Sequence, residues 1–153
     1  MAELSDEVID FLSMGTRTAM LAYLAADGRP LAAPVWFIVD NGELVLNTGR
    51  ESAKGRALAR DSRVVSCVDD PHPPYSFVAG CGAAKKEASV HDGAEDLLEI
   101  ATRIGGRYMG ADRAKEFGQR NAVPGKLVVR VRPTKIISAF NIADSHAGQE
   151  GTP

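Results

Sequence analysis

The fold of this chain is decided by the stretch Leu46-Asn47-Thr48-Gly49-Arg50-Glu51-Ser52-Ala53-Lys54-Gly55-Arg56. A short apolar run leads into this stretch, and a segment rich in Ala and Arg follows it. The pattern predicts a strand, a turn at Gly49 and then a helix. Ser52 is the predicted N-cap, because its hydroxyl can accept a hydrogen bond from a free backbone N–H of the first turn.

The start of this helix is a candidate site for an anion. The first-turn N–H groups lack helical partners, and the aligned peptide dipoles place partial positive charge there. Lys54 adds a full positive charge that opposes the helix dipole, and a bound phosphate would offset this repulsion. The alternative is a capped surface helix with solvated basic residues. A nucleoside-triphosphate loop is excluded, because Arg56-Ala57 stands where that motif requires Lys-Ser/Thr.

Composition favours an ordinary soluble protein of 153 residues, long enough for one domain with its own core. The net charge is −2 and the basic residues are scattered, which argues against nucleic acid as the main partner. The first fifteen residues do not resemble a secretory signal, and the longest apolar stretch, 30–39, is too short to cross a bilayer. We therefore expect a cytoplasmic protein that does not contact a membrane.

Turn signals divide the chain into short strands with helices between them. An Asp27-Gly28 turn and an Asn41-Gly42 turn predict hairpins. Ser5 is expected to cap a short first helix. The strands are expected at 16–24, 31–39, 43–48, 63–69, 75–90 and 126–140, the last interrupted by Pro133. Further helices are expected at 52–61, from 92 to about 110 with a weak point at Gly105-Gly106, and at 112–119.

Strands at short spacing joined by hairpins favour an antiparallel barrel over a parallel sheet. We predict one domain, residues 1–143, followed by a disordered tail, 144–153.

No residue pattern indicates a catalytic nucleophile or a metal. Motifs for a serine nucleophile are missing, and the three histidines are far apart in the sequence. Cys67 stands among valines, which is typical of a buried free thiol. Redox chemistry would therefore have to come from a cofactor, which the protein binds and orients.

The chain resembles the pyridoxamine-phosphate-oxidase-like flavin-binding split-barrel family. The resemblance rests on Thr48-x-x-x-Ser52-x-Lys54 after a strand, with Arg63-Val64-Val65-Ser66 beyond it, and extends from about Leu12 to Phe140. It implies a mainly β fold, a six-stranded antiparallel split barrel of Greek-key type flanked by helices. It also implies a homodimer with the cofactor at the subunit interface.

The resemblance implies where the cofactor lies. The phosphate is expected at Asn47, Thr48, Ser52, Ala53 and Lys54, assisted by Arg50 and Arg56. The ring is expected along Pro34, Val35 and Trp36, and Tyr75 and Ser76 match a strand that meets the cofactor, often from the partner subunit. For Trp36 and Tyr75, the alternative is a purely structural aromatic side chain.

Gly28-Arg29-Pro30 and Pro34-Val35-Trp36-Phe37 are similar to the branch that uses the deazaflavin coenzyme F-420. Flavin-phosphate oxidases carry basic residues at the positions of Ala33 and Ile38, which are neutral here. The resemblance therefore implies an oxidoreductase that transfers a hydride from reduced F-420 to a small unsaturated or quinone-like substrate. Two alternatives remain open, a reductase or oxidase that uses flavin mononucleotide (FMN) and a non-enzymatic flavin- or tetrapyrrole-binding protein.

Overall fold

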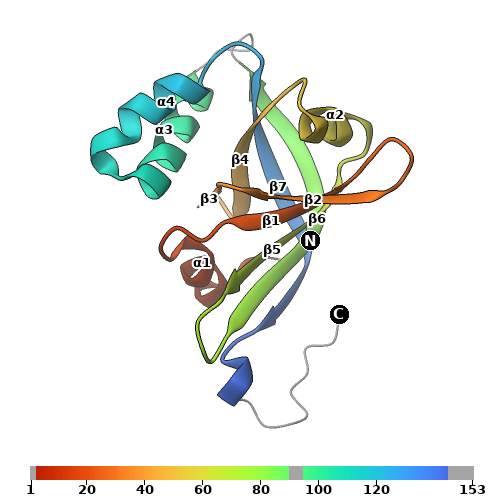
Figure 1. Cartoon of the computed structure of the whole chain (residues 1–153), viewed down its shortest axis with the longest axis vertical. Helices are drawn as coiled ribbons and strands as arrows, with labels where there is room; N and C mark the ends of the chain where they lie inside the picture. Colours follow the sequence, from red (N-terminus) through yellow and green to blue (C-terminus); the bar gives the residue numbers. More distant parts are fainter. Residues whose placement is uncertain (1–2, 90–94, 145–153) are drawn as a thin grey trace.

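The computed structural model describes residues 3–89 and 95–144, which form one curled antiparallel sheet with helices around it (Figure 1). The sheet has seven strands in the order β2-β1-β5-β6-β7-β4-β3. The strands are β1 (Ala19–Leu24), β2 (Pro30–Val35), β3 (Ile38–Asp40), β4 (Glu43–Gly49), β5 (Arg63–Asp70), β6 (Ser76–Ser89) and β7 (Lys126–Ala139). The helices are α1 (Asp6–Ser13), α2 (Ala53–Arg60), α3 (Glu95–Met109), α4 (Ala114–Asn121) and the 3₁₀ turns η2 (Ala111–Arg113) and η3 (Ile142–Asp144).

The two edges of the sheet are consecutive in the sequence. β2 ends at Val35 and β3 begins at Ile38, so only Trp36 and Phe37 join one edge strand to the other. The sheet must therefore curl until its edges meet, which makes it a split barrel. The predicted single strand 31–39 is wrong in this detail, and its division gives seven strands where six were expected.

Apolar side chains fill both faces of β4. Leu44 and Leu46 pack in the barrel core with Phe37, Leu21 and other buried residues. Val45, between them, points to the other side, where it packs against α3 in a second cluster with Ile38, Leu97, Ile100, Ile104 and Val128. Burying each of these large side chains contributes roughly 1.5–3 kcal/mol. The second cluster holds α3 against the outside of the barrel at β3, β4 and β7.

The outer side of the sheet is apolar across five strands. Met20 pairs with Pro34 on one side and with Cys67 on the other, and the same row continues through Ala79 to Ile137. The next row contains Ala22, Val65 and Cys81. Residues directly opposite each other share one face of a sheet. We call this surface, Met20, Ala22, Val65, Cys67, Ala79, Cys81 and Ile137, the outer apolar face; Met20 is 46% exposed and Val65 39%.

One predicted interruption is absent, and one predicted weak point lies inside a continuous helix. Pro133 does not divide β7: the pairing with β6 shifts register between Cys81 and Gly82, so the strand passes Pro133 at a bulge. The helix α3 continues past the predicted weak point at Gly105-Gly106 to Met109. A Cβ at Gly105 would lie 2.6 Å from the Cβ of Phe117, so this glycine lets α4 pack closely on α3.

The predicted caps and hairpins are confirmed. Ser5 accepts a hydrogen bond from the Val8 N–H and Ser52 from the Gly55 N–H. Asn41 and Gly42 both have positive φ, as a tight hairpin turn requires. Of the predicted tail, only Asp144 belongs to the described residues, where it ends η3. No helix within 3–89 and 95–144 is long and apolar enough to cross a membrane.

Candidate functional site

A cavity of about 400 Å³ lies where β2, β4, α2 and the α3–α4 hairpin converge. β2 and the residue after it supply Pro34, Val35 and Trp36, and β4 with the start of α2 supplies Asn47, Thr48, Gly49, Ser52 and Lys54. Ile104, Asn121 and Lys126 complete the lining. We call it the lysine cavity. One end is formed by a strand terminus and an aromatic ring, and the other by the N-terminus of a helix and two lysines.

The turn between β4 and α2 is held tightly by its own hydrogen bonds. Ser52 Oγ lies 3.0 Å from the Gly55 N and 2.6 Å from the Gly49 carbonyl oxygen. The Arg50 N–H donates to the Gly125 carbonyl at 2.7 Å, which ties this turn to the turn before β7. Gly55 allows the close approach, since a Cβ there would collide with the Gly49 and Arg50 carbonyl oxygens. The helix N-terminus is therefore fixed relative to the cavity.

The lysine end of the cavity is electropositive. Lys54 and Lys126 both line it, and among residues 3–89 and 95–144 no Asp or Glu belongs to its lining. Both lysines are half-buried, and neither has an ion pair with any residue that the structure describes. The N–H groups of Ala53 and Lys54 precede the first intrahelical hydrogen bond, from Arg56 to Ser52. These charges and donors suit an anion such as a phosphate group.

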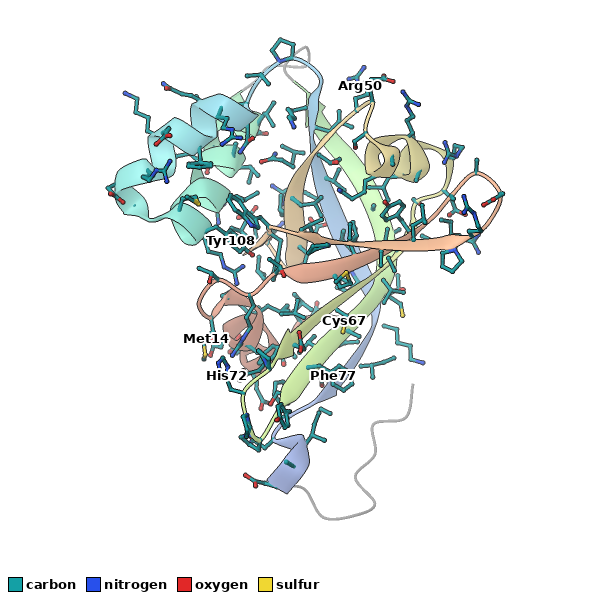
Figure 2. All side chains as sticks on the ribbon, in the orientation of Figure 1. Met14, Arg50, Cys67, His72, Phe77 and Tyr108 are labelled. Carbon is teal, nitrogen blue, oxygen red and sulfur yellow. The ribbon has the colours of Figure 1, made fainter. Side chains whose placement is uncertain are left out.

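The other end of the cavity is walled by Trp36, which is 37% exposed. Its indole stacks on the ring of Tyr108 from α3, with centroids 4.9 Å apart and planes 5° from parallel. Phe117 of α4 lies against the same indole at 6.1 Å. Tyr108 lies where α3 faces the strands (Figure 2). Burial raises the pKa of the Tyr108 hydroxyl, so this group stays protonated at neutral pH.

The predicted site residues fall into three places. Seven of them line the lysine cavity: Pro34, Val35, Trp36, Asn47, Thr48, Ser52 and Lys54. Ala53 is exposed at the start of α2. Arg50 and Arg56 instead line a neighbouring cavity of about 410 Å³ with Glu51, Gly55, Ala59, Arg60 and Leu127, which we call the arginine cavity. Their roles in binding a cofactor stay predictions.

Tyr75 and Ser76 do not reach the lysine cavity of their own chain. They stand at the start of β6 beside Phe77, at the opposite end of the molecule from Arg50 (Figure 2). Tyr75 is 47% exposed, and its carbonyl accepts from the Ile142 N–H of η3. Their contact with a cofactor, from this chain or from a second subunit, stays a prediction.

Sequence reasoning missed the residues that the α3–α4 hairpin and β7 bring to the cavity. Ile104 and Asn121 come from helices whose placement depends on the second apolar cluster. Lys126 reaches the cavity because it pairs with Gly49 across β4 and β7. No local pattern marks Lys126, since it is a single lysine after a glycine turn. Only the pairing of β7 with β4 brings Lys126 close to α2, the helix that carries Lys54.

Three comparisons relate this chain to known proteins. A family model described as pyridoxamine 5'-phosphate oxidase matches residues 4–139. Among solved structures, the chain is similar to the conserved hypothetical protein Rv2991 from Mycobacterium tuberculosis, with 26% identity, a TM-score of 0.78, and 94% of this chain and 90% of that chain covered. No curated protein matches it.

Two further solved structures share the fold at lower identity. One is named F420 reductase, with 22% identity, a TM-score of 0.63, and 83% of this chain and 94% of that chain covered. The other is HutZ, a heme storage protein from Vibrio cholerae, with 15% identity, a TM-score of 0.68, and 93% and 99% covered. Since the family model spans most of the sequence and the curled antiparallel sheet agrees with it, the chain belongs to the pyridoxamine 5'-phosphate oxidase family.

Proposed function

We propose that this protein is an oxidoreductase that binds the deazaflavin coenzyme F-420 in the lysine cavity and reduces a small unsaturated or quinone-like substrate. The observation that carries the proposal is the polarity of the cavity. An aromatic and apolar wall stands at one end and Lys54 and Lys126 stand at the other, and within the described part of the chain no acidic residue belongs to the lining. A cofactor with a planar aromatic ring at one end and a phosphate at the other matches this arrangement.

The residues present fit such a group. Lys54, Lys126 and the free N–H groups at the start of α2 would hold the phosphate by charge-assisted hydrogen bonds. The ring would lie along Pro34, Val35 and Trp36, which exclude water from one side of it. When bound, the deazaflavin supplies a carbon-centred hydride donor, and the protein contributes binding, orientation and electrostatics.

Two features favour F-420 over FMN. Ala33 packs against the barrel core and Ile38 is buried in the cluster beneath α3, so neither offers a charge to a flavin phosphate. The arginine cavity lies on the other side of the turn that begins α2 and presents Arg50, Arg56 and Arg60. F-420 carries an acidic oligoglutamate tail, for which these arginines are suitable partners. Glu51 offsets part of their charge by pairing with Arg56 at 3.4 Å.

A titration of the purified protein against both cofactors tests the proposal. Trp36 is the only tryptophan, so quenching of tryptophan fluorescence reports a ligand near this residue, which lines the lysine cavity. We expect tighter binding of F-420 than of FMN, and equal or reversed affinities would contradict the choice of F-420. Turnover of a quinone with reduced F-420 then separates an enzyme from the alternative, a protein that only stores its ligand.

We also propose that the protein acts as a homodimer that buries the outer apolar face. A sheet face exposed to water normally carries polar residues at alternate positions. Here the outward row from Met20 to Ile137 is apolar, and at its other end it reaches Pro34, which lines the lysine cavity. A second copy on this face would lie beside the cavity. That position could bring Tyr75 and Ser76 of one subunit toward the cofactor of the other.

A further inference from the structure

The residues that join the two edges of the barrel have no backbone hydrogen-bond partners in the sheet. Trp36 and Phe37 lie between β2 and β3, outside both ladders. Buried backbone groups need hydrogen-bond partners, and Phe37 is fully buried. Its N–H donates to the Tyr108 hydroxyl at 3.2 Å, and its carbonyl accepts from Arg107 at 2.7 Å. Consecutive side chains of α3 thus replace the missing strand partner.

Arg107 connects the junction between β2 and β3, formed by Trp36 and Phe37, to the end of α1. Its guanidinium donates to the carbonyls of Leu12 at 2.6 Å and Gly15 at 3.0 Å as well as to Phe37. It also lies over the Phe37 ring, 4.6 Å from the centroid. Burial lowers the pKa of the guanidinium from its ordinary value. The planar guanidinium carries five donors in a fixed fork, so it holds three carbonyl oxygens from two backbone segments at once.

Tyr108 acts on both the backbone and the side chain of the junction. While its hydroxyl accepts from Phe37, it donates to the Arg17 carbonyl at 2.7 Å, so both of its hydrogen-bonding roles are used. Its ring supports the indole of Trp36 in a parallel stack. The position of the cavity's aromatic wall therefore depends on side chains from outside the barrel, with Tyr108 in the parallel stack and Phe117 beside it.

We infer that Tyr108 is a positioning residue for the binding site: it fixes the plane of Trp36 and so determines how tightly the cavity accepts a planar ring. The identity of that ring rests on the proposed function, but the positioning itself does not. Arg107 supports the same arrangement through the backbone. Tyr108 does not line the cavity, so its effect on a ligand is indirect, through the Trp36 stack and the Phe37 backbone.

The test compares Tyr108→Leu, which removes stack and hydroxyl, with Tyr108→Phe, which keeps the ring. Leu98→Ala is the matched control, because Leu98 is an exposed residue of the same helix. In the protein without ligand, we expect Tyr108→Leu to lower the fluorescence anisotropy of Trp36 and to speed hydrogen–deuterium exchange over 36–38. Tyr108→Phe should keep most of the anisotropy but still speed exchange, since the Phe37 N–H loses its acceptor.

Titration with FMN and with F-420 completes the test. Loss of an aromatic stack should weaken binding of the preferred cofactor by about three- to tenfold in Tyr108→Leu, and Leu98→Ala should bind as the wild type does. Unchanged anisotropy and exchange in Tyr108→Leu would overturn the inference. If that variant does not fold, unchanged exchange over 36–38 in Tyr108→Phe overturns the backbone contact, and unchanged anisotropy in the milder Tyr108→Met overturns the role of the ring. A wild-type protein that binds neither cofactor refutes the proposed function, while anisotropy and exchange still decide the role of Tyr108.

Discussion

The hydroxyl oxygens of Thr48 and Ser52 lie 3.1 Å apart at the N-terminus of α2. Since Ser52 donates its one proton to the Gly49 carbonyl, Thr48 must be the donor between the two hydroxyls. Ser52 then accepts from Thr48 and from the Gly55 N–H. Both hydroxyl protons are thus used within the turn. An anion at this place depends on Lys54, Lys126 and the free backbone N–H groups, unless it displaces one of these bonds.

Lys54→Ala should weaken cofactor binding by about one to two decades, because it removes a charge-assisted hydrogen bond of roughly 1.5–3 kcal/mol. The melting temperature should hardly change, since a first-turn lysine opposes the helix dipole. Fluorescence titration and thermal melting measure both quantities. Lys115→Ala is the control, because Lys115 is exposed on α4 away from the cavity lining. If Lys54→Ala binds as the wild type does, the phosphate lies elsewhere.

Ser52→Ala should lower both stability and affinity. The lost N-cap costs roughly 0.5–2 kcal/mol of unfolding free energy. Affinity should fall as well, because the turn that presents Lys54 loses its internal bonds. Ser5→Ala is a matched control, since Ser5 caps α1 in the same way but lies outside the cavity lining. It should lose comparable stability in a denaturant titration and keep full affinity; equal losses of affinity in both variants would refute a local role for Ser52.

Gly55→Ala should destabilise the protein by about 1–3 kcal/mol, although alanine is the better helix former. The reason is the collision of the new Cβ with the Gly49 and Arg50 carbonyl oxygens, which would push α2 away from β4. Gly49→Ala serves for comparison in the same denaturant titration. A Cβ at Gly49 meets nothing closer than 3.7 Å, so that variant should be nearly as stable as the wild type. The reverse order of stability would contradict this account of the turn.

Met20→Lys should convert the proposed dimer to a monomer. Burying an unpaired lysine in an apolar interface costs several kcal/mol, which weakens association of the two subunits by several orders of magnitude. Sedimentation velocity measures the change, and the monomer should bind cofactor more weakly. Leu98→Lys is the control, because it introduces the same charge at an exposed apolar residue of α3 outside the outer apolar face. A wild-type monomer with full cofactor affinity would remove the basis for the proposed dimer.

Local sequence signals predicted most of the elements correctly. The caps at Ser5 and Ser52, the turns at Asp27-Gly28 and Asn41-Gly42, and the helix after Gly49 all depend on neighbours within four residues. Such interactions are complete within a short segment, so the sequence alone specifies them. Local patterns did not predict the structure where it depends on packing against a residue far away in the sequence. The sequence predicts only a weak point at Gly105 and does not show that Phe117 of α4 packs on it.

Local sequence patterns were enough to predict the antiparallel class of the fold and the strand–turn–helix around Ser52. They also showed that the positions of Ala33 and Ile38 carry no charge. Tertiary structure decided that 31–39 divides at Trp36 and Phe37, since α3 supplies the hydrogen bonds that keep Phe37 out of the sheet. It also decided that Lys126 joins Lys54 at one cavity, because β7 pairs with β4 across a long sequence separation. A linear pattern cannot show such pairing, since the contact exists only once the sheet has curled and its register is set.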